Sequence, residues 1–207
     1  MAAGRPVEWF EDLYQEAARG HAVIPWADLI PNPHLVSWLD GAGQGLARGR
    51  ALDVGTGLGD NAAELSRRGL EVTAFDVSRT AVEAAERRFP GFAITWRAAD
   101  VLSPPNEWKG SFDLIFEAYT LQVLPPAERR RAEASLRSLL APGGLLLVVA
   151  RGREPEDPPG TFPWPLTVAE VRAIAGDSLE LATFEDFLDQ EEPPVRRLRA
   201  TFRAPRP

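Results

Sequence analysis

Short apolar runs alternate with longer polar stretches through the middle of the chain, from residue 50 to 150. The apolar runs predict strands, because short runs bounded by turn residues are typical of buried strands. The stretch from Asp60 to Arg68 predicts a helix that Gly69 ends. Alternating strands and helices predict an α/β fold, with a parallel sheet covered by helices on both faces. The expected strands are 51–54, 72–76, 93–97, 111–117 and 145–149.

The core 50–150 is preceded by an N-terminal extension, residues 1–49. Helices are expected there at 7–19 and 33–41. Together with the C-terminal zone, we expect these parts to form one domain over 1–207.

The C-terminal zone, 151–207, begins with a proline-rich polar loop, here called the late loop (151–166), and continues with an expected helix at 167–175. Two strands are expected at 179–189 and 194–202, as an antiparallel pair at the sheet edge. In the last strand, polar and apolar positions alternate, with Arg197, Arg199 and Thr201 set against Leu198, Ala200 and Phe202. This period of two predicts a strand with one buried face.

Composition limits the class of protein. A chain of 207 residues with 44% apolar content fits one globular domain with a sizeable core. The net charge of −7 argues against a nucleic-acid partner, which requires a basic face. The densest basic run, 129–131, begins an expected helix beside Glu128 and Glu133, so we interpret it as a solvated helix face.

Targeting and metal signals are also weak in this sequence. No apolar stretch reaches the ~20 residues that span a bilayer, and the N-terminal residues lack an apolar signal core. We therefore expect a cytoplasmic protein without membrane contact. The chain has no cysteine, and its only histidines are His21 and His34, so no metal site is expected.

The candidate chemistry begins with Asp53-x-Gly55-x-Gly57-x-Gly59 after the first strand, and with Asp76 at the end of the second. Glycine adopts positive φ angles and lets backbone amides approach a ligand closely. The following helix directs its positive N-terminal end at the same space. Asp76, at the carboxyl edge of the sheet, can accept both hydroxyls of a ribose. This order of strand, glycine turn, helix and a second strand that ends on a carboxylate predicts a pocket for a nucleoside attached to a small polar group.

Asp60 indicates which nucleoside is bound. Dinucleotide sites place their third glycine where Asp60 stands, and a carboxylate there would repel a pyrophosphate. It suits a ligand with cationic sulfonium and amino groups better, so a nucleotide-dependent oxidoreductase is the disfavoured alternative. At this point the sequence resembles the class I S-adenosylmethionine-dependent methyltransferases, whose glycine motif starts on an acidic residue, as it does at Asp53.

The resemblance extends over about residues 50 to 150. Segment 98–101 is similar to the family's adenine segment, 111–117 to its fourth strand, and 139–149 to its helix, turn and fifth strand. It implies a single Rossmann-like domain, with a mainly parallel seven-stranded sheet and an antiparallel strand near the C-terminus. It also implies S-adenosyl-L-methionine as cofactor and S-adenosyl-L-homocysteine as product.

The resemblance assigns roles to individual positions. Asp76 would hold the ribose, Val77 would pack on the adenine, and Asp100 would face the adenine amine. The residues expected to bind the cofactor are Asp53, Gly55, Thr56, Gly57, Gly59, Asn61, Asp76, Val77, Asp100, Val101, Glu117, Ala118 and Trp26.

Five aromatic residues, four outside the core and one after its fourth strand, are the candidates for binding a small-molecule acceptor: Trp9, Tyr14, Trp26, Trp164 and Tyr119. They could exclude water and hold a sulfonium by cation–π attraction. The alternative is that they only bury the extension against the core. Adjacent prolines place Trp26 and Trp164 in stiff, extended segments that do not favour a deep core position.

The extension and late loop are also similar to the small-molecule thiol methyltransferases, the thiopurine and tellurite-resistance-like group. A thiol is substantially ionised near neutral pH and hardly needs a base, whereas a hydroxyl does. Only Tyr14, His21 and Tyr119 are candidate catalytic residues. We therefore expect methyl transfer to a thiol or another soft nucleophile, mainly by proximity and orientation. An O- or N-methyltransferase of a secondary metabolite and a non-catalytic regulatory module remain open.

Overall fold

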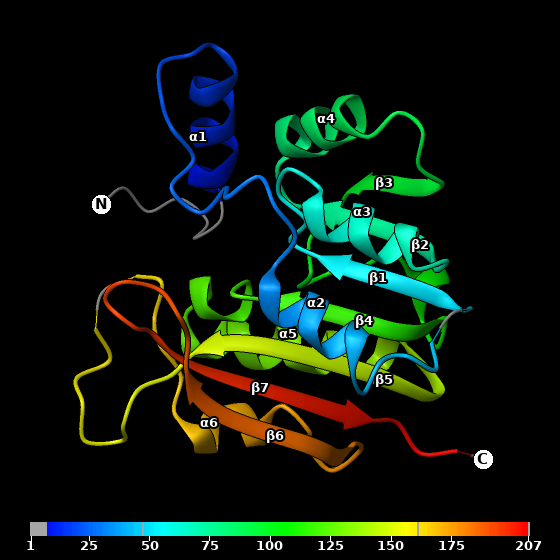
Figure 1. Cartoon of the computed structure of the whole chain (residues 1–207), viewed down its shortest axis with the longest axis vertical. Helices are drawn as coiled ribbons and strands as arrows, with labels where there is room; N and C mark the ends of the chain where they lie inside the picture. Colours follow the sequence, from blue (N-terminus) through cyan, green and yellow to red (C-terminus); the bar gives the residue numbers. More distant parts are fainter. Residues whose placement is uncertain (1–7, 47, 161, 207) are drawn as a thin grey trace. The chain divides into compact units, whose positions relative to one another are not determined.

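The computed structural model describes residues 8–46, 48–160 and 162–206. Seven strands make one mixed sheet in the order β3-β2-β1-β4-β5-β7-β6. The chain divides into two compact units, Met1–Pro104 and Pro105–Pro207, here called the first and second unit. The predicted seven-stranded, mainly parallel sheet with an antiparallel C-terminal pair is confirmed (Figure 1).

The first unit contains three parallel strands, β1 (Arg50–Val54), β2 (Glu71–Asp76) and β3 (Ile94–Ala98). Four of the five residues of β1 are buried, as expected of a strand covered on both faces. Helix α3 (Asp60–Arg67) links β1 to β2, and α4 (Arg79–Arg88) links β2 to β3. Ala62, Ala63, Leu65, Ala81 and Ala85 form the buried faces of these two helices.

The N-terminal extension contributes α1 (Glu8–Ala18) and α2 (Pro33–Asp40), within one or two residues of the predicted bounds. Helix α2 begins with a proline in its first turn, and the side chain of Asn32 caps it by accepting from the His34 amide. Helix α1 packs against α4, as Figure 1 shows.

The second unit contains β4 (Phe112–Ala118), β5 (Leu140–Arg151), β6 (Glu180–Leu188) and β7 (Arg196–Arg203). β4 and β5 are parallel, and β7 runs antiparallel to both β5 and β6. The remaining elements are α5 (Pro126–Leu139), α6 (Val168–Ala173) and the short helices η1 (Asn106–Trp108) and η2 (Leu121–Val123).

Lys109, the chain's single lysine, follows η1 and is exposed before the amino end of β4. No helix in the described ranges is both long and apolar enough to cross a bilayer.

Two expectations about arginines are wrong. Arg129 does not lie on a solvated helix face: it is buried and pairs with Glu170 at 3.4 Å. Strand β7 does not have one buried face, because Arg197 and Thr201 are buried as well as the apolar residues between them. In both cases, elements distant in sequence bury the polar side chain, and ion pairing with such elements or contact with them offsets the free-energy cost of its desolvation.

Candidate functional site

The glycine loop between β1 and α3 is built on left-handed backbone. Gly55, Gly57 and Gly59 have φ angles of 64°, 54° and 88°, which other residues rarely adopt. A Cβ at Gly57 would lie 3.0 Å from the Tyr14 hydroxyl. A Cβ at Gly59 would lie 2.7 Å from the Trp96 ring. The loop thus requires glycine both for its conformation and for space.

Asp53 is a carboxyl group that the fold buries beside this loop, with only 1% of the residue exposed. It accepts a hydrogen bond from Thr56 Oγ1 at 2.6 Å and another from the Ala62 amide in the first turn of α3. Because the N-cap residue Gly59 has no side chain, Asp53 supplies the missing cap. Burial and the nearby charge of Asp76 raise the pKa of Asp53 to about 7, although the Thr56 hydrogen bond opposes the shift.

Asp76 is the last residue of β2 and is held in one orientation by backbone amides. The Gly57 amide donates to Oδ2 at 3.0 Å, and the Ser78 amide donates to Oδ1 at 2.9 Å. Burial raises the pKa of Asp76 above its usual range. Each oxygen keeps acceptor capacity for a hydroxyl, and the adjacent Val77 exposes an apolar side chain. The pair can therefore bind a diol and cover a planar ring beside it.

Helix α1 is attached to the start of α4 through Glu11. Its Oε2 accepts from the Ser78 hydroxyl at 2.6 Å and from the Thr80 amide at 3.2 Å, while Oε1 accepts from the Thr80 hydroxyl at 2.6 Å. Burial raises the pKa of Glu11, but these hydrogen bonds and one from Gln15 outweigh it and lower the pKa to about 2. Glu11 is therefore ionised at neutral pH, and it attaches α1 two residues after Asp76.

Tyr14 lies one turn after Glu11 in an aromatic cluster. Its hydroxyl accepts a hydrogen bond from Trp26 Nε1 at 3.0 Å, and the residue is 3% exposed. The Trp26 ring lies edge-on to Trp9 and Phe10, at centroid distances of 5.7 and 5.5 Å. Burial and the charge of Asp76 raise the pKa of Tyr14. Its hydroxyl therefore stays protonated at neutral pH and cannot act as a general base.

Three other predicted cofactor residues of the first unit mainly organise backbone. The side-chain oxygen of Asn61 accepts from the Asn32 amide at 2.8 Å, just before α2. Oδ1 of Asp100 accepts from the Leu102 amide at 2.8 Å, and Val101 is buried.

In the second unit, Tyr119 follows β4 with a φ of 64°, which is strained for an aromatic residue. Its amide donates to the Val149 carbonyl at 3.1 Å, and the Arg197 guanidinium lies 5.1 Å from its ring centroid. Glu117 Oε1 accepts from the Leu121 amide at 2.9 Å and so closes the same turn. A strained residue that its surroundings fix in this way is characteristic of functional sites.

Glu117 and Ala118, the two residues before Tyr119, are also held in place. Glu117 is 1% exposed, and burial raises its pKa to about 7 against the hydrogen bonds from the Leu121 and Thr120 amides. Ala118 is half-buried and lies opposite Val149 in the β4–β5 ladder.

Arg197 is held in turn by two carboxylates. Its Nε donates to Asp189 Oδ2 at 2.6 Å, and its Nη2 donates to Glu191. Only 4% of the Arg197 side chain and 6% of the Asp189 side chain are exposed, so this is a buried ion pair.

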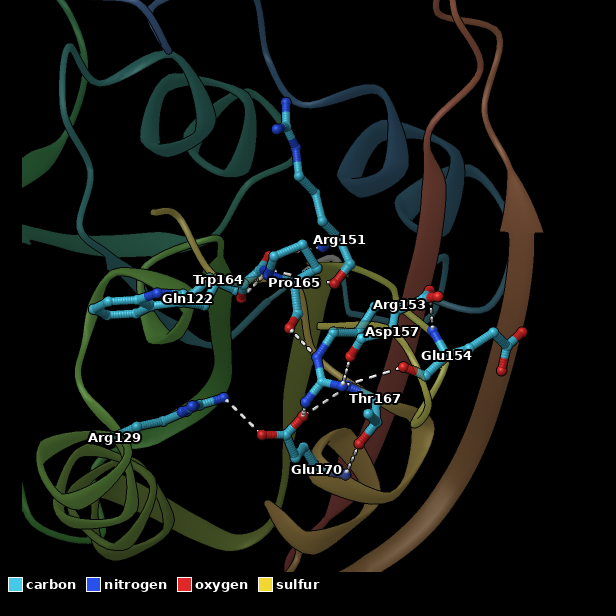
Figure 2. A network of polar contacts seen from close by, with 10 residues as sticks. All are labelled: Gln122, Arg129, Arg151, Arg153, Glu154, Asp157, Trp164, Pro165, Thr167 and Glu170. Carbon is cyan, nitrogen blue, oxygen red and sulfur yellow. Dashed lines mark hydrogen bonds and ion pairs between the residues drawn. The ribbon is translucent and has the colours of Figure 1, made fainter. Parts of the chain in front are cut away.

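One buried glutamine connects η2 to the late loop (Figure 2). Gln122 Oε1 accepts from the Arg151 amide at 2.7 Å, and its Nε2 donates to the carbonyls of Arg151 at 3.3 Å and Trp164 at 2.8 Å. The Trp164 amide donates to the Gln122 carbonyl at 2.9 Å. Gln122 thereby fixes the backbone of both residues.

The sequence of this region is similar to that of known proteins. Residues 51–144 match the family model described as a methyltransferase domain. The match covers 94 of the 207 residues, so it is a likeness of this segment to the methyltransferase domain. The matched segment spans the glycine loop, Asp76 and β4.

Two curated relatives carry methyltransferase names. An uncharacterized methyltransferase of Mycobacterium tuberculosis is 37% identical over 100 residues, 47% of this chain and 48% of that protein. A ubiquinone biosynthesis O-methyltransferase of Pseudomonas aeruginosa is 30% identical over 128 residues, 60% of this chain and 53% of that protein. The chain spans about half the length of these curated relatives, 48% and 53%.

A solved structure has the same fold over most of the chain. The N-methyltransferase NodS of Bradyrhizobium japonicum, in complex with S-adenosyl-L-homocysteine, superposes with a TM-score of 0.74. Its sequence is 24% identical, and the likeness covers 93% of this chain and 98% of that one. The likeness shows the methyltransferase fold beyond the 51–144 segment.

Within the first unit, the structure brings the glycine loop, Asp53, Asp76, Tyr14 and Trp26 together. His21 lies elsewhere, exposed after α1 and facing Glu16 at 3.3 Å. No group of three or more His, Asp or Glu side chains in the described ranges forms a candidate metal site.

Two residues that shape these groups, Glu11 and Gln122, were not predicted, and neither was the contact of the Arg197 guanidinium with the Tyr119 ring. Glu11 and Ser78 are separated by 67 positions, and Gln122 and Trp164 by 42. No local pattern marks such partners. The sequence offers one signal for Glu11: it lies three residues before Tyr14 and therefore on the same face of the helix.

Proposed function

We propose that the protein transfers a methyl group from S-adenosylmethionine to a small-molecule acceptor. The observation that carries this proposal is Asp76, which the Gly57 and Ser78 amides orient beside a left-handed glycine loop. This geometry suits a ribose on the carboxyl edge of β2. The methyltransferase domain match over 51–144 supports the same cofactor.

The residues of the first unit fit the groups of this cofactor. Asp76 would accept the ribose hydroxyls, Val77 would cover the adenine, and Asp100 would face the adenine amine. Asp53, with the glycine loop, would provide negative charge on the methionine side. Thr56, Asn61, Val101 and Trp26 complete the proposed cofactor set of the first unit. The family resemblance assigns Glu117 and Ala118, in the second unit, to the same cofactor.

When bound, S-adenosylmethionine supplies an electrophilic methyl group on a sulfonium. The sulfur–methyl bond breaks as the acceptor–methyl bond forms, the sulfur keeps the bonding electron pair, and a protonated acceptor gives its proton to solvent. The chain's part is to align donor and acceptor and to exclude water, and alignment can contribute about 7–11 kcal/mol. Tyr14 and Trp26 would provide an aromatic cover with one oriented hydroxyl.

A thiol or another soft nucleophile is the proposed acceptor, as in the thiopurine and tellurite-resistance-like group. Tyr14 stays protonated, and His21 is exposed and faces Glu16. Glu117 accepts hydrogen bonds from backbone amides and is 1% exposed. An acceptor that ionises without a base suits these residues.

O- or N-methylation is the second candidate. It is favoured by the names of two similar proteins, the ubiquinone biosynthesis O-methyltransferase and the N-methyltransferase NodS. Tyr119 and Trp164 would then serve, as for a thiol, to bind the acceptor.

Calorimetric titration with S-adenosyl-L-homocysteine, with NAD as comparison ligand, tests the cofactor. We expect one-to-one binding of S-adenosyl-L-homocysteine and none of NAD. Asp76→Asn should weaken binding at least tenfold, since a hydrogen bond to a charged group contributes ~1.5–3 kcal/mol. Equal binding by Asp76→Asn and the wild type would contradict the assignment. Incubation with labelled cofactor and a panel of thiols, phenols and amines then identifies the acceptor, and label on phenols alone would remove the thiol proposal.

A further inference from the structure

Four arginines lie where β5 ends and β7 begins, at Arg151, Arg153, Arg196 and Arg197. Three of them are neutralised by carboxylates within 3.2 Å. The pairs are Arg153 with Glu170, Arg196 with Asp186 and Glu154, and Arg197 with Asp189 and Glu191. This end of the second unit is therefore closely balanced in charge, except at one position.

The exception is Arg151, the last residue of β5. Its side chain is exposed, and within the described ranges its guanidinium makes no hydrogen bond or ion pair. Acidic residues outnumber basic ones in the chain by 30 to 23, so carboxylates are not scarce. Figure 2 shows the guanidinium directed away from the network that holds Arg153 and Glu170. Arg151 therefore presents an unneutralised, forked donor group.

Although its side chain is unpaired, the backbone of Arg151 is fixed on both sides. The buried Gln122 accepts from its amide at 2.7 Å and donates to its carbonyl at 3.3 Å. The same amide group holds the carbonyl of Trp164 at 2.8 Å. One glutamine thus fixes the backbone from which a cationic and an aromatic side chain extend.

The sheet places Arg151 on the same face as Tyr119. Arg151 lies directly opposite Arg197 in the antiparallel β5–β7 ladder, and opposite residues in such a ladder project to the same face. The Arg197 guanidinium lies over the Tyr119 ring. Arg151 and Tyr119 also follow the carboxyl ends of parallel strands, where α/β sheets bind ligands.

We propose that Arg151 binds a carboxylate carried by the methyl acceptor, so that the protein selects small planar acids. This rests on the proposed methyl transfer. A guanidinium binds a carboxylate through two parallel hydrogen bonds, and the aromatic ring of Tyr119, on the same face of the sheet, suits a planar body. The site distinguishes acceptors by charge, independently of the atom that is methylated.

Two thiols of the same shape, one with a carboxylate and one with a neutral amide, test this assignment. Binding of 4-mercaptobenzoate and of neutral 4-mercaptobenzamide is measured by calorimetry in the presence of saturating S-adenosyl-L-homocysteine. The variants are Arg151→Met, Arg151→Lys and the control Arg131→Met, which removes the same charge from an exposed position of α5. Methyl transfer to both thiols is measured separately with S-adenosylmethionine.

The wild type should bind the carboxylate at least about tenfold more tightly than the amide, the difference expected from a charge-assisted hydrogen bond. Arg151→Met should reduce this preference to about twofold or less, Arg151→Lys should keep part of it, and Arg131→Met should leave it unchanged. A wild type without the preference, without binding of either thiol, or with the preference intact in Arg151→Met would overturn the proposal. If the preference depends on Arg151 but neither thiol is methylated, the anion site stands and thiol methylation fails.

Discussion

At the scale of single residues, we expect Asp53 to couple ligand charge to proton binding. Burial raises its pKa to about 7, so the carboxyl is largely protonated in the ligand-free protein below that pH. By itself, a raised carboxyl pKa makes the folded state less stable as the pH increases from the unfolded value through 7. A cationic ligand bound nearby would favour the ionised carboxylate and would therefore offset this loss of stability.

We therefore expect the affinity for S-adenosylmethionine to increase about tenfold from pH 6 to pH 8, because a pKa near 7 leaves about a tenth of Asp53 ionised at pH 6. S-adenosyl-L-homocysteine, which lacks the sulfonium charge, should show a smaller change. Calorimetry in buffers of different ionisation enthalpy should detect proton release on binding of the sulfonium ligand. Asp53→Asn should abolish both effects, and a pH-dependent affinity that persists in this variant would exclude Asp53 as their source.

Tyr119 stores backbone strain, and substitution can separate this strain from the function of its ring. A non-glycine residue in the left-handed region costs roughly 1–2 kcal/mol. Tyr119→Ala removes the ring and keeps the strain, whereas Tyr119→Gly removes both. We expect the glycine variant to unfold at higher urea concentration than the alanine variant, by ~1 kcal/mol.

Leu29, with a φ of 58° and 57% exposure, provides a matched pair of variants, Leu29→Ala and Leu29→Gly. The same stability difference is expected there. Both Tyr119 variants should lose turnover of the acceptor to a similar degree, since both lack the ring. An alanine variant as stable as the glycine variant at Tyr119 would show that this backbone position is not strained in solution.

At the scale of elements, α1 depends on one carboxylate. Glu11 joins this helix to the first turn of α4 through Ser78 and Thr80. Glu11→Ala should weaken the attachment by roughly 1–3 kcal/mol, since hydrogen bonds to a charged group are lost. The amides of α1 should then exchange with solvent faster, and the affinity for S-adenosyl-L-homocysteine should fall.

Asp12→Ala is the control for Glu11, because Asp12 is the next residue of α1 and is exposed. It should leave exchange and affinity unchanged. The pKa of Glu11 is lowered from 4.5 to about 2, so its stabilisation is complete above pH 4.5 and is lost as the pH falls through 2. Equal exchange rates in both variants would mean that other contacts hold α1.

The sequence predicts elements far better than it predicts the side-chain partners between them. Strand and helix positions, the glycine loop and Asp76 follow from local rules, because period, glycine and capping act over a few residues. Arg129 and Arg197 looked like solvent-facing residues by those same rules. Their burial depends on Glu170 and Asp189, whose positions only the folded chain determines.

At the scale of the whole molecule, cofactor binding should increase thermal stability. A ligand at about 100 times its dissociation constant stabilises a folded protein by ~2.7 kcal/mol. For a chain of this size this corresponds to an increase in Tm of roughly 5–10 °C. We expect differential scanning fluorimetry to show this with S-adenosyl-L-homocysteine and to show no change with NAD. An equal shift with both ligands would argue against a specific nucleoside site.

The exposed Lys109, before the amino end of β4, has a practical consequence. Amine-reactive reagents can modify only this side chain and the α-amino group, because the other cationic side chains are arginines and histidines. A dye or a sensor surface coupled there would be attached at the opposite end of β4 from Tyr119. Lys109 therefore provides a defined handle for immobilising the protein in ligand screening.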